Sequence, residues 1–85
     1  RILSDEEYKV FCDLNNDRRK LEYLGGRFAG KEAFLKALKK GIGEIPFKDI
    51  SILNDETGAP YLNYTNAFIS ISHEHEYVVA FVVIQ

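Results

Sequence analysis

The chain has 85 residues, of which 46% are hydrophobic, and its formal net charge is −2 at pH 7. This length allows one domain with one modest core, and the charge provides no overall attraction to nucleic acid or to an anionic membrane. A single cysteine, Cys12, excludes an internal disulfide framework, and no apolar run is long enough to cross a bilayer, so we expect a reduced, cytoplasmic setting.

A first helix is predicted close to the start of the chain. Ser4, followed three residues later by Glu7, matches a capping box, in which each residue satisfies a backbone N–H group of the other. Apolar side chains then recur at helical spacing as far as Leu14. The polar residues 15–17 interrupt this pattern, so we expect one helix to end there and another to begin.

The second helix is expected to run from Arg18 to a stop at Gly41, because glycine suits the left-handed position just past a helix end. One face has almost no side chains and would allow another segment to approach closely. Charged side chains border the predicted apolar stripe, where they are costly unless they are paired or hold a ligand. The stripe comprises Leu21, Leu24, Phe28, Leu35 and Leu38, the small face comprises Gly25, Gly26, Ala29, Gly30, Ala33 and Ala37, and the charges are Arg27, Lys31, Glu32 and Lys36.

Strands are predicted in the second half of the chain. Residues 47–55 alternate apolar and polar side chains and meet a turn cluster before Tyr61 and Leu62, which predicts a β-hairpin. Residues 67–72 also alternate, and the valine-rich run at 77–84 is typical of a strand buried on both faces. Helices packed on an antiparallel β-sheet make an α+β fold, and we expect one domain over residues 1–85.

Each charged group on the second helix has an alternative interpretation that requires no site. Glu32 and Lys36 have the spacing and orientation of a simple surface ion pair. The ammonium of Lys31 could extend past the apolar stripe into water. Both alternatives stay open on these residues alone.

Polar residues also gather at the end of the strand predicted from residue 67. Ser72 and His73 could donate hydrogen bonds to a phosphate, and the alternative is turn chemistry with a solvated histidine. His73 and His75 have the spacing of a His-x-His metal pair, but no third ligand can be identified.

Two separated motifs carry a resemblance to a known family. "GRFAGKEAFLKAL" on the second helix and "ISISHEHEYVVAFVVI" at the end of the chain resemble the holo-acyl-carrier-protein synthases, which are bacterial 4′-phosphopantetheinyl transferases. The residues between them are similar to the connecting loop and hairpin of that family, so the resemblance covers nearly the whole chain.

The resemblance implies transfer of 4′-phosphopantetheine from coenzyme A to a serine of apo acyl carrier protein, which releases adenosine 3′,5′-bisphosphate and serves fatty acid biosynthesis. It implies that Glu32 holds a Mg²⁺ ion and that Lys36 lies beside the reacting phosphate, which makes these the catalytic residues. It further implies a cytoplasmic homotrimer with no nucleic-acid or membrane partner. The residues expected to bind coenzyme A are Arg27, Lys31, Lys36, Gly58, Pro60, Ser72 and His73.

Two parts of the family pattern have no counterpart in this sequence: an opening strand whose aspartate is the other metal ligand, and an amphipathic helix where only residues 63–66 stand. We therefore expect that the domain lacks an N-terminal strand and a short internal segment. The alternative function is a catalytically inactive relative or fragment that only binds carrier protein or nucleotide. A nucleic-acid-binding module is less favoured, because the basic residues it would use do not share one helix face and the net charge is negative. These residues are Arg18, Arg19, Lys20, Arg27 and Lys31.

Overall fold

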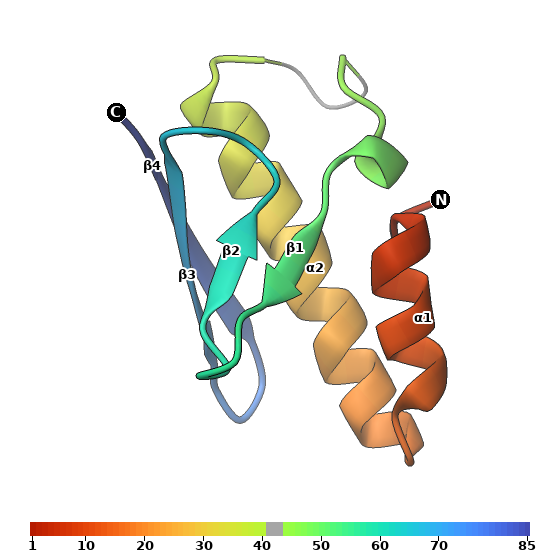
Figure 1. Ribbon diagram of the computed structural model, residues 1–85. Helices are drawn as coiled ribbons and strands as arrows, with labels where there is room; N and C mark the ends of the chain where they lie inside the picture. The colour runs from red at the N-terminus through yellow and green to blue at the C-terminus, as the bar shows by residue number, and fades with distance from the viewer. Residues whose placement is uncertain (41–43) are drawn as a thin grey trace.

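Two helices precede the strands in the computed structural model, which describes residues 1–40 and 44–85. The long helix α2 lies between α1 on one side and the strands on the other (Figure 1). This arrangement is the α+β fold that the order of the sequence patterns predicts. The elements are α1 (Asp5–Asp13), α2 (Asp17–Ala37), the short 3₁₀ helix η1 (Phe47–Asp49), β1 (Ile52–Asn54), β2 (Pro60–Leu62), β3 (Ala67–His73) and β4 (Val78–Ile84).

Both helix starts follow from local capping. The Ser4 side chain accepts a hydrogen bond from the Glu7 backbone N–H at 3.3 Å, and the Glu7 carboxylate accepts one from the Ser4 backbone N–H at 2.8 Å. The Asn16 side chain caps α2 by accepting from the Arg19 N–H at 2.9 Å. The predicted capping box and the predicted break between the helices are therefore confirmed.

The end of α2 differs from the prediction. The helix ends at Ala37, and Lys39 rather than a glycine adopts the left-handed conformation, with φ 60°. The Lys39 N–H donates to the Lys36 carbonyl at 2.9 Å and the Lys40 N–H donates to the Leu35 carbonyl at 2.8 Å, which is the pattern of a Schellman motif. Gly41, where the sequence predicts the stop, lies outside the described residues.

The buried face of α2 also differs from the predicted apolar stripe. Leu21 is 71% exposed and Phe28 is 39% exposed, whereas Phe34 and Leu35 are buried. The small face packs closely: a Cβ atom at Gly30 would lie only 2.6 Å from the Ile52 side chain. Because the strands cover this glycine-rich side of the helix and α1 lies on another side, part of the predicted stripe is left in contact with solvent.

Two antiparallel hairpins complete the molecule. β1 pairs with β2, which places Ile52 opposite Leu62, and β3 pairs with β4, which places Ser72 opposite Val79. The first pairing confirms the predicted hairpin, with shorter strands than the pattern indicates. The core lies between α2 and these hairpins and comprises Phe34, Leu35, Ile50, Ile52 and Leu62.

The prediction that the last strand is buried on both faces is wrong for the single chain. Phe81 is 72% exposed and Val83 is 56% exposed, and Phe68 on β3 lies on the same side of the hairpin, opposite Val83. The other face of β4 packs against α2. We call the apolar side formed by Phe68, Val79, Phe81 and Val83 the outer hairpin face.

No helix within residues 1–40 or 44–85 combines the length and the apolar character that a membrane span requires.

Candidate active site

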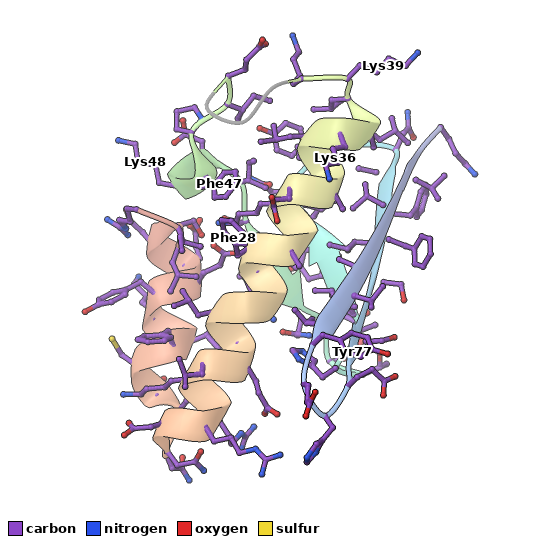
Figure 2. The ribbon with its side chains drawn as sticks, turned by 180° about the vertical axis from the view of Figure 1, so that it is seen from behind. Phe28, Lys36, Lys39, Phe47, Lys48 and Tyr77 are labelled. Carbon is purple, nitrogen blue, oxygen red and sulfur yellow. The ribbon has the colours of Figure 1, made fainter. Side chains whose placement is uncertain are left out.

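Glu32 and Lys36 stand one helical turn apart on α2. Phe28 and Lys36 both project from α2, and Phe28 lies beside Phe47 of η1 (Figure 2). Glu32 is half-buried and Lys36 is exposed. Phe28 packs edge-on against Phe47, with their ring centroids 5.7 Å apart. This side of α2 therefore presents one carboxylate and one ammonium beside an aromatic pair.

The alternative interpretation of a surface ion pair between Glu32 and Lys36 is not supported. Their charged atoms do not come within 4.0 Å of each other, and neither side chain forms a hydrogen bond or ion pair among the described residues. Both groups therefore remain available for a ligand, which is the arrangement that a site requires.

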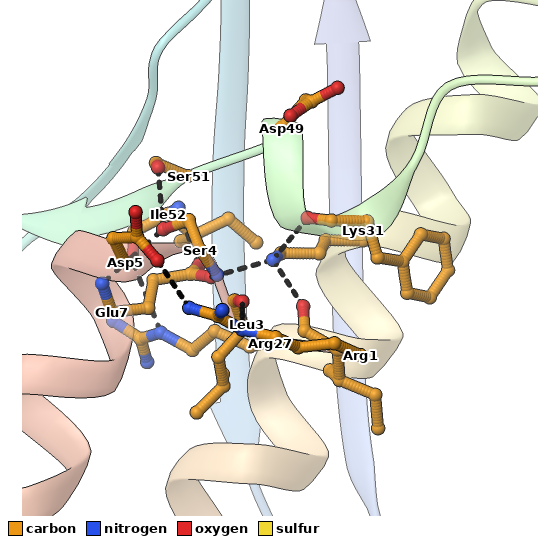
Figure 3. Close-up of polar contacts among 12 residues, drawn as sticks. Arg1, Leu3, Ser4, Asp5, Glu7, Arg27, Lys31, Asp49, Ser51 and Ile52 are labelled. Carbon is orange, nitrogen blue, oxygen red and sulfur yellow. Dashed lines mark hydrogen bonds and ion pairs between the residues drawn. The ribbon is translucent and has the colours of Figure 1, made fainter.

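Lys31 has a different environment from the one that the sequence suggests. Its side chain is fully buried, and its ammonium donates three hydrogen bonds: to the Glu7 carboxylate at 2.6 Å, to the Ile2 carbonyl at 2.6 Å and to the Phe47 carbonyl at 2.8 Å (Figure 3). Burial lowers the pKa of Lys31, and the negative charge of Glu7 opposes that shift.

The expectation that Lys31 binds a phosphate of coenzyme A is therefore wrong for this structure. An ammonium has three donors, and all three are committed to protein oxygens. The alternative that Lys31 extends into water is wrong for the same reason. The sequence analysis did not identify Glu7 as the partner of Lys31, because the capping box already accounted for the presence of Glu7. A buried lysine requires a carboxylate from elsewhere in the chain. That general requirement was the signal in the sequence that pointed to Glu7.

Arg27 is almost completely buried between α2 and the first hairpin. Its Nε donates to the Ile52 carbonyl at 3.2 Å, and its Nη2 donates to the Asn54 side chain at 2.6 Å. The guanidinium also lies 3.9 Å from the ring centroid of Tyr23. Burial lowers the pKa of Arg27 and raises that of Tyr23. Arg27 therefore has a structural role here, while other N–H groups of its fork remain without a hydrogen bond among the described residues.

Asn54 joins Arg27 to the tip of the first hairpin. The Asn54 side chain donates to the Gly58 carbonyl at 2.9 Å, and Gly58 itself has the positive φ of 89° that this tight turn requires. Thr57 donates two hydrogen bonds to Asp55 and lowers the pKa of that carboxyl group. The structure thus brings two predicted coenzyme A contacts, Arg27 and Gly58, into one hydrogen-bonded chain, through a residue that the sequence analysis did not select.

His73 lies at the opposite end of the second hairpin from the chain terminus and rests on α2. Its ring is so close to Gly26 that a Cβ atom there would lie 3.1 Å from it. Ser72 is on the other face of β3, because neighbouring residues of a strand point to opposite sides. The side chains of Ser72 and His73 therefore lie on opposite faces of β3 and are not brought together.

A surface cavity lies beside His73, between the first half of α2 and the β3–β4 loop. Arg18 lines it, which the sequence analysis did not foresee. The signal was present in the spacing, because Arg18 precedes Gly25 by seven residues and so lies on the same side of the helix. From α2 the cavity is lined by Arg18, Leu21, Glu22 and Gly25, and from the hairpin by His73 to Val78.

The sequence as a whole matches one family model. The description of that model is the 4′-phosphopantetheinyl transferase superfamily, and the match spans residues 1–82. The chain belongs to this superfamily. The predicted family and the predicted α+β fold are therefore confirmed.

Superfamily members with high similarity are holo-[acyl-carrier-protein] synthases. One from Streptococcus pyogenes is 48% identical to this chain, over all of the chain and 75% of the relative. The crystal structure of the Bacillus anthracis enzyme, in complex with CoA (3′,5′-ADP), superposes with a TM-score of 0.85 at 44% identity and covers 96% of this chain and 74% of that one. The Neisseria meningitidis enzyme gives a TM-score of 0.87 at 35% identity, over all of this chain and 77% of that one.

In this chain the two groups of side chains lie along different parts of α2. Glu32 and Lys36 lie in its second half, and Arg18 and His73 flank its first half. Because a helix rises 1.5 Å per residue, the ring of His73 over Gly26 and the carboxylate of Glu32 are separated by about 9 Å along the axis. A ligand that contacts both groups must be extended.

Proposed function

We propose that this protein transfers the 4′-phosphopantetheine group of coenzyme A to a serine of an apo acyl carrier protein. Membership of the superfamily supports this activity, as does the coenzyme A ligand bound by the Bacillus anthracis relative. The observation that carries the proposal is the pair Glu32 and Lys36, one turn apart and without partners among the described residues.

The reaction displaces one phosphate oxygen by another. The serine hydroxyl oxygen forms a bond to the phosphorus that carries pantetheine, the diphosphate bond breaks, and adenosine 3′,5′-bisphosphate leaves with the bridging oxygen. The hydroxyl proton passes to a base. Negative charge on the phosphate oxygens is stabilised by fixed cations, and the exposed ammonium of Lys36 is our candidate for that role.

A divalent cation, Mg²⁺ in our proposal, fits the carboxylate of Glu32. No group of three or more His, Cys, Asp or Glu side chains is placed to hold a metal ion in the described part of the chain. Mg²⁺ requires only one or two protein carboxylates and takes its other ligands from phosphate and water, so a single unpartnered carboxylate is compatible with it. When bound, the cation would neutralise the diphosphate and orient it.

The nucleotide end of coenzyme A is assigned to the cavity beside His73. Arg18, His73 and His75 line this cavity and can carry positive charge toward a phosphate. We retain Arg27, Gly58 and Pro60 as candidates for contacts at the first hairpin, and Ser72 as a candidate on the outer hairpin face, where its side chain is exposed. Lys31 is left out because its donors are committed.

Copies of the chain associate through the outer hairpin face in this proposal, as a homotrimer. On β4 this face is apolar throughout, and on β3 it carries Phe68 opposite Val83, with the small side chain of Ser70 opposite Phe81. A short chain that exposes such a surface gains stability by burying it against identical copies. A cytoplasmic location and a part in fatty acid biosynthesis complete the proposal and rest on the family resemblance.

The test is a direct assay of the reaction. The protein is incubated with coenzyme A, Mg²⁺ and apo acyl carrier protein, and the carrier is then analysed by mass spectrometry. A mass increase of one phosphopantetheine group on the carrier serine is expected. Binding of coenzyme A or carrier protein without any mass increase would instead favour the inactive relative.

A further inference from the structure

Lys31 connects three separate parts of the chain to α2. Its ammonium donates to the Ile2 carbonyl ahead of α1, to the Glu7 carboxylate on α1, and to the Phe47 carbonyl on η1, over distances of 2.6, 2.6 and 2.8 Å (Figure 3). Lys31 is also the residue directly before Glu32. Contacts that hold Lys31 in place therefore also restrain the helix next to the proposed metal ligand.

Glu7 is itself held in place by contacts that do not involve Lys31. One carboxylate oxygen accepts from the Ser4 N–H at 2.8 Å, and the other accepts from the Ile52 N–H at 2.7 Å. Ser51 adds a hydrogen bond to the Ser4 hydroxyl at 2.7 Å. Because α1 and β1 both hold this carboxylate, it cannot follow Lys31 if α2 rotates.

Gly30 fixes α2 on the side of the strands. A Cβ atom there would lie 2.6 Å from the Ile52 side chain and 2.9 Å from the Ile69 side chain, so the helix already lies at its closest approach. Two consecutive residues, Gly30 and Lys31, thus contact different elements. Together they fix the rotation of α2 about its own axis.

The rotation of α2 decides where Glu32 and Lys36 point. Their charged groups lie several ångströms beyond the Cα radius of about 2.3 Å, so a rotation of roughly 20° would move them by about 2 Å. A misplacement of about 1 Å is sufficient to cost about 100-fold in rate when groups must meet a reacting phosphate.

We propose that Glu7 and Lys31 are positioning residues, which set the rotation of α2 and so hold Glu32 and Lys36 at the diphosphate. This inference rests on the proposed function. Stability alone is a weak explanation of the pair, because a buried ion pair is often replaceable by apolar residues without loss of stability. The core around Phe34 and Leu35 already anchors the helix by apolar packing.

Two variants and a control test the proposal. Lys31→Met removes the ammonium. The double variant Glu7→Gln with Lys31→Met avoids leaving a buried charge unpaired, which by itself is strongly destabilising. Leu62→Ala is the control, because it weakens the core on β2 while its side chain makes no hydrogen bond to Glu7 or Lys31. Each protein is studied at a temperature where circular dichroism shows it to be fully folded.

The measurements distinguish an effect on the position of Glu32 and Lys36 from an effect on the stability of the protein. In both variants we expect kcat to fall by about tenfold or more and the affinity for Mn²⁺, measured by electron paramagnetic resonance with coenzyme A bound, to fall by about 10- to 100-fold. The dissociation constant for adenosine 3′,5′-bisphosphate, which we assign to the distant cavity, should change by less than about twofold. Leu62→Ala should lower the melting temperature and leave kcat and Mn²⁺ affinity nearly unchanged.

The double variant decides the outcome. Wild-type kcat and Mn²⁺ affinity in that variant would overturn the proposal. Failure of the variant to fold would also overturn it, because the pair would then be required for folding and not for the position of Glu32. Glu32→Gln, measured in parallel, separates the proposed metal ligand from the proposed positioning role. If Glu32→Gln leaves Mn²⁺ affinity unchanged, Glu32 is not the metal ligand. If Glu32→Gln lowers Mn²⁺ affinity and the double variant does not, only the positioning role of Glu7 and Lys31 is refuted.

Discussion

At the scale of single residues, the proposed chemistry depends on charged side chains that have no partner among residues 1–40 and 44–85. Glu32 is half-buried and forms no ion pair with Lys36, one turn away. We predict that Glu32→Gln lowers turnover by about 100-fold or more, because the amide keeps the size of the side chain and loses the charge that holds a cation. Its free energy of unfolding should change by less than about 0.5 kcal/mol.

The measurement is kcat at several Mg²⁺ concentrations, together with urea denaturation. Glu6→Gln, at an exposed position in the first turn of α1, is the control for loss of one carboxylate. Activity of Glu32→Gln within threefold of wild type at low Mg²⁺ would contradict the assignment.

His73 allows a second prediction at this scale, because it shares a surface cavity with Arg18. His73→Ala should weaken the binding of coenzyme A by about tenfold, since a hydrogen bond to a charged phosphate is lost. Dephospho-coenzyme A, which lacks the 3′-phosphate, should bind the variant and the wild type equally. Calorimetric titration of both ligands checks this; equal losses for the two would place His73 elsewhere in the site.

At the scale of elements, the end of α2 stores conformational strain. Lys39 occupies the left-handed position of a Schellman motif, which glycine adopts at no steric cost. We predict that Lys39→Gly stabilises the protein by about 0.5–1 kcal/mol, because relief of the strain exceeds the entropy that glycine adds to the unfolded chain. The comparison with Lys39→Ala in chemical denaturation removes the effect of the lost charge. A lower stability of the glycine variant than of the alanine variant would show that Lys39 is not strained.

At the scale of the whole molecule, the second hairpin is covered by α2 on one side only. Phe81 is 72% exposed on the outer hairpin face, so the single chain does not need it for its core. We predict that Phe81→Ser converts an oligomer to monomers and leaves the circular dichroism spectrum unchanged. Val10→Ser, a comparable loss of an exposed apolar side chain on α1, should have no such effect. Light scattering measures the mass of each variant; an unchanged mass for Phe81→Ser would exclude this face as the interface.

The sequence by itself determined the features that depend on neighbouring residues. Ser4 and Glu7 predict the start of α1, residues 15–17 predict the break before α2, and the alternation at residues 67–72 predicts a strand, because capping and side-chain periodicity act over a few residues. The motif around Glu32 and the motif at His73 were sufficient to predict the family, since a match of residues in order requires no coordinates.

Only the tertiary structure decided which side of each element is buried and which charges meet. Periodicity placed Leu21 and Phe28 in the core, but the glycine-rich side of α2 packs on the strands instead, because small residues allow the closest approach. Lys31 was assigned to a phosphate, and its partner proved to be Glu7, 24 residues earlier in the chain. Local rules carry no information on such pairs: burying an ammonium requires a compensating carboxylate, and only the packing of α1 against α2 specifies which carboxylate lies within reach.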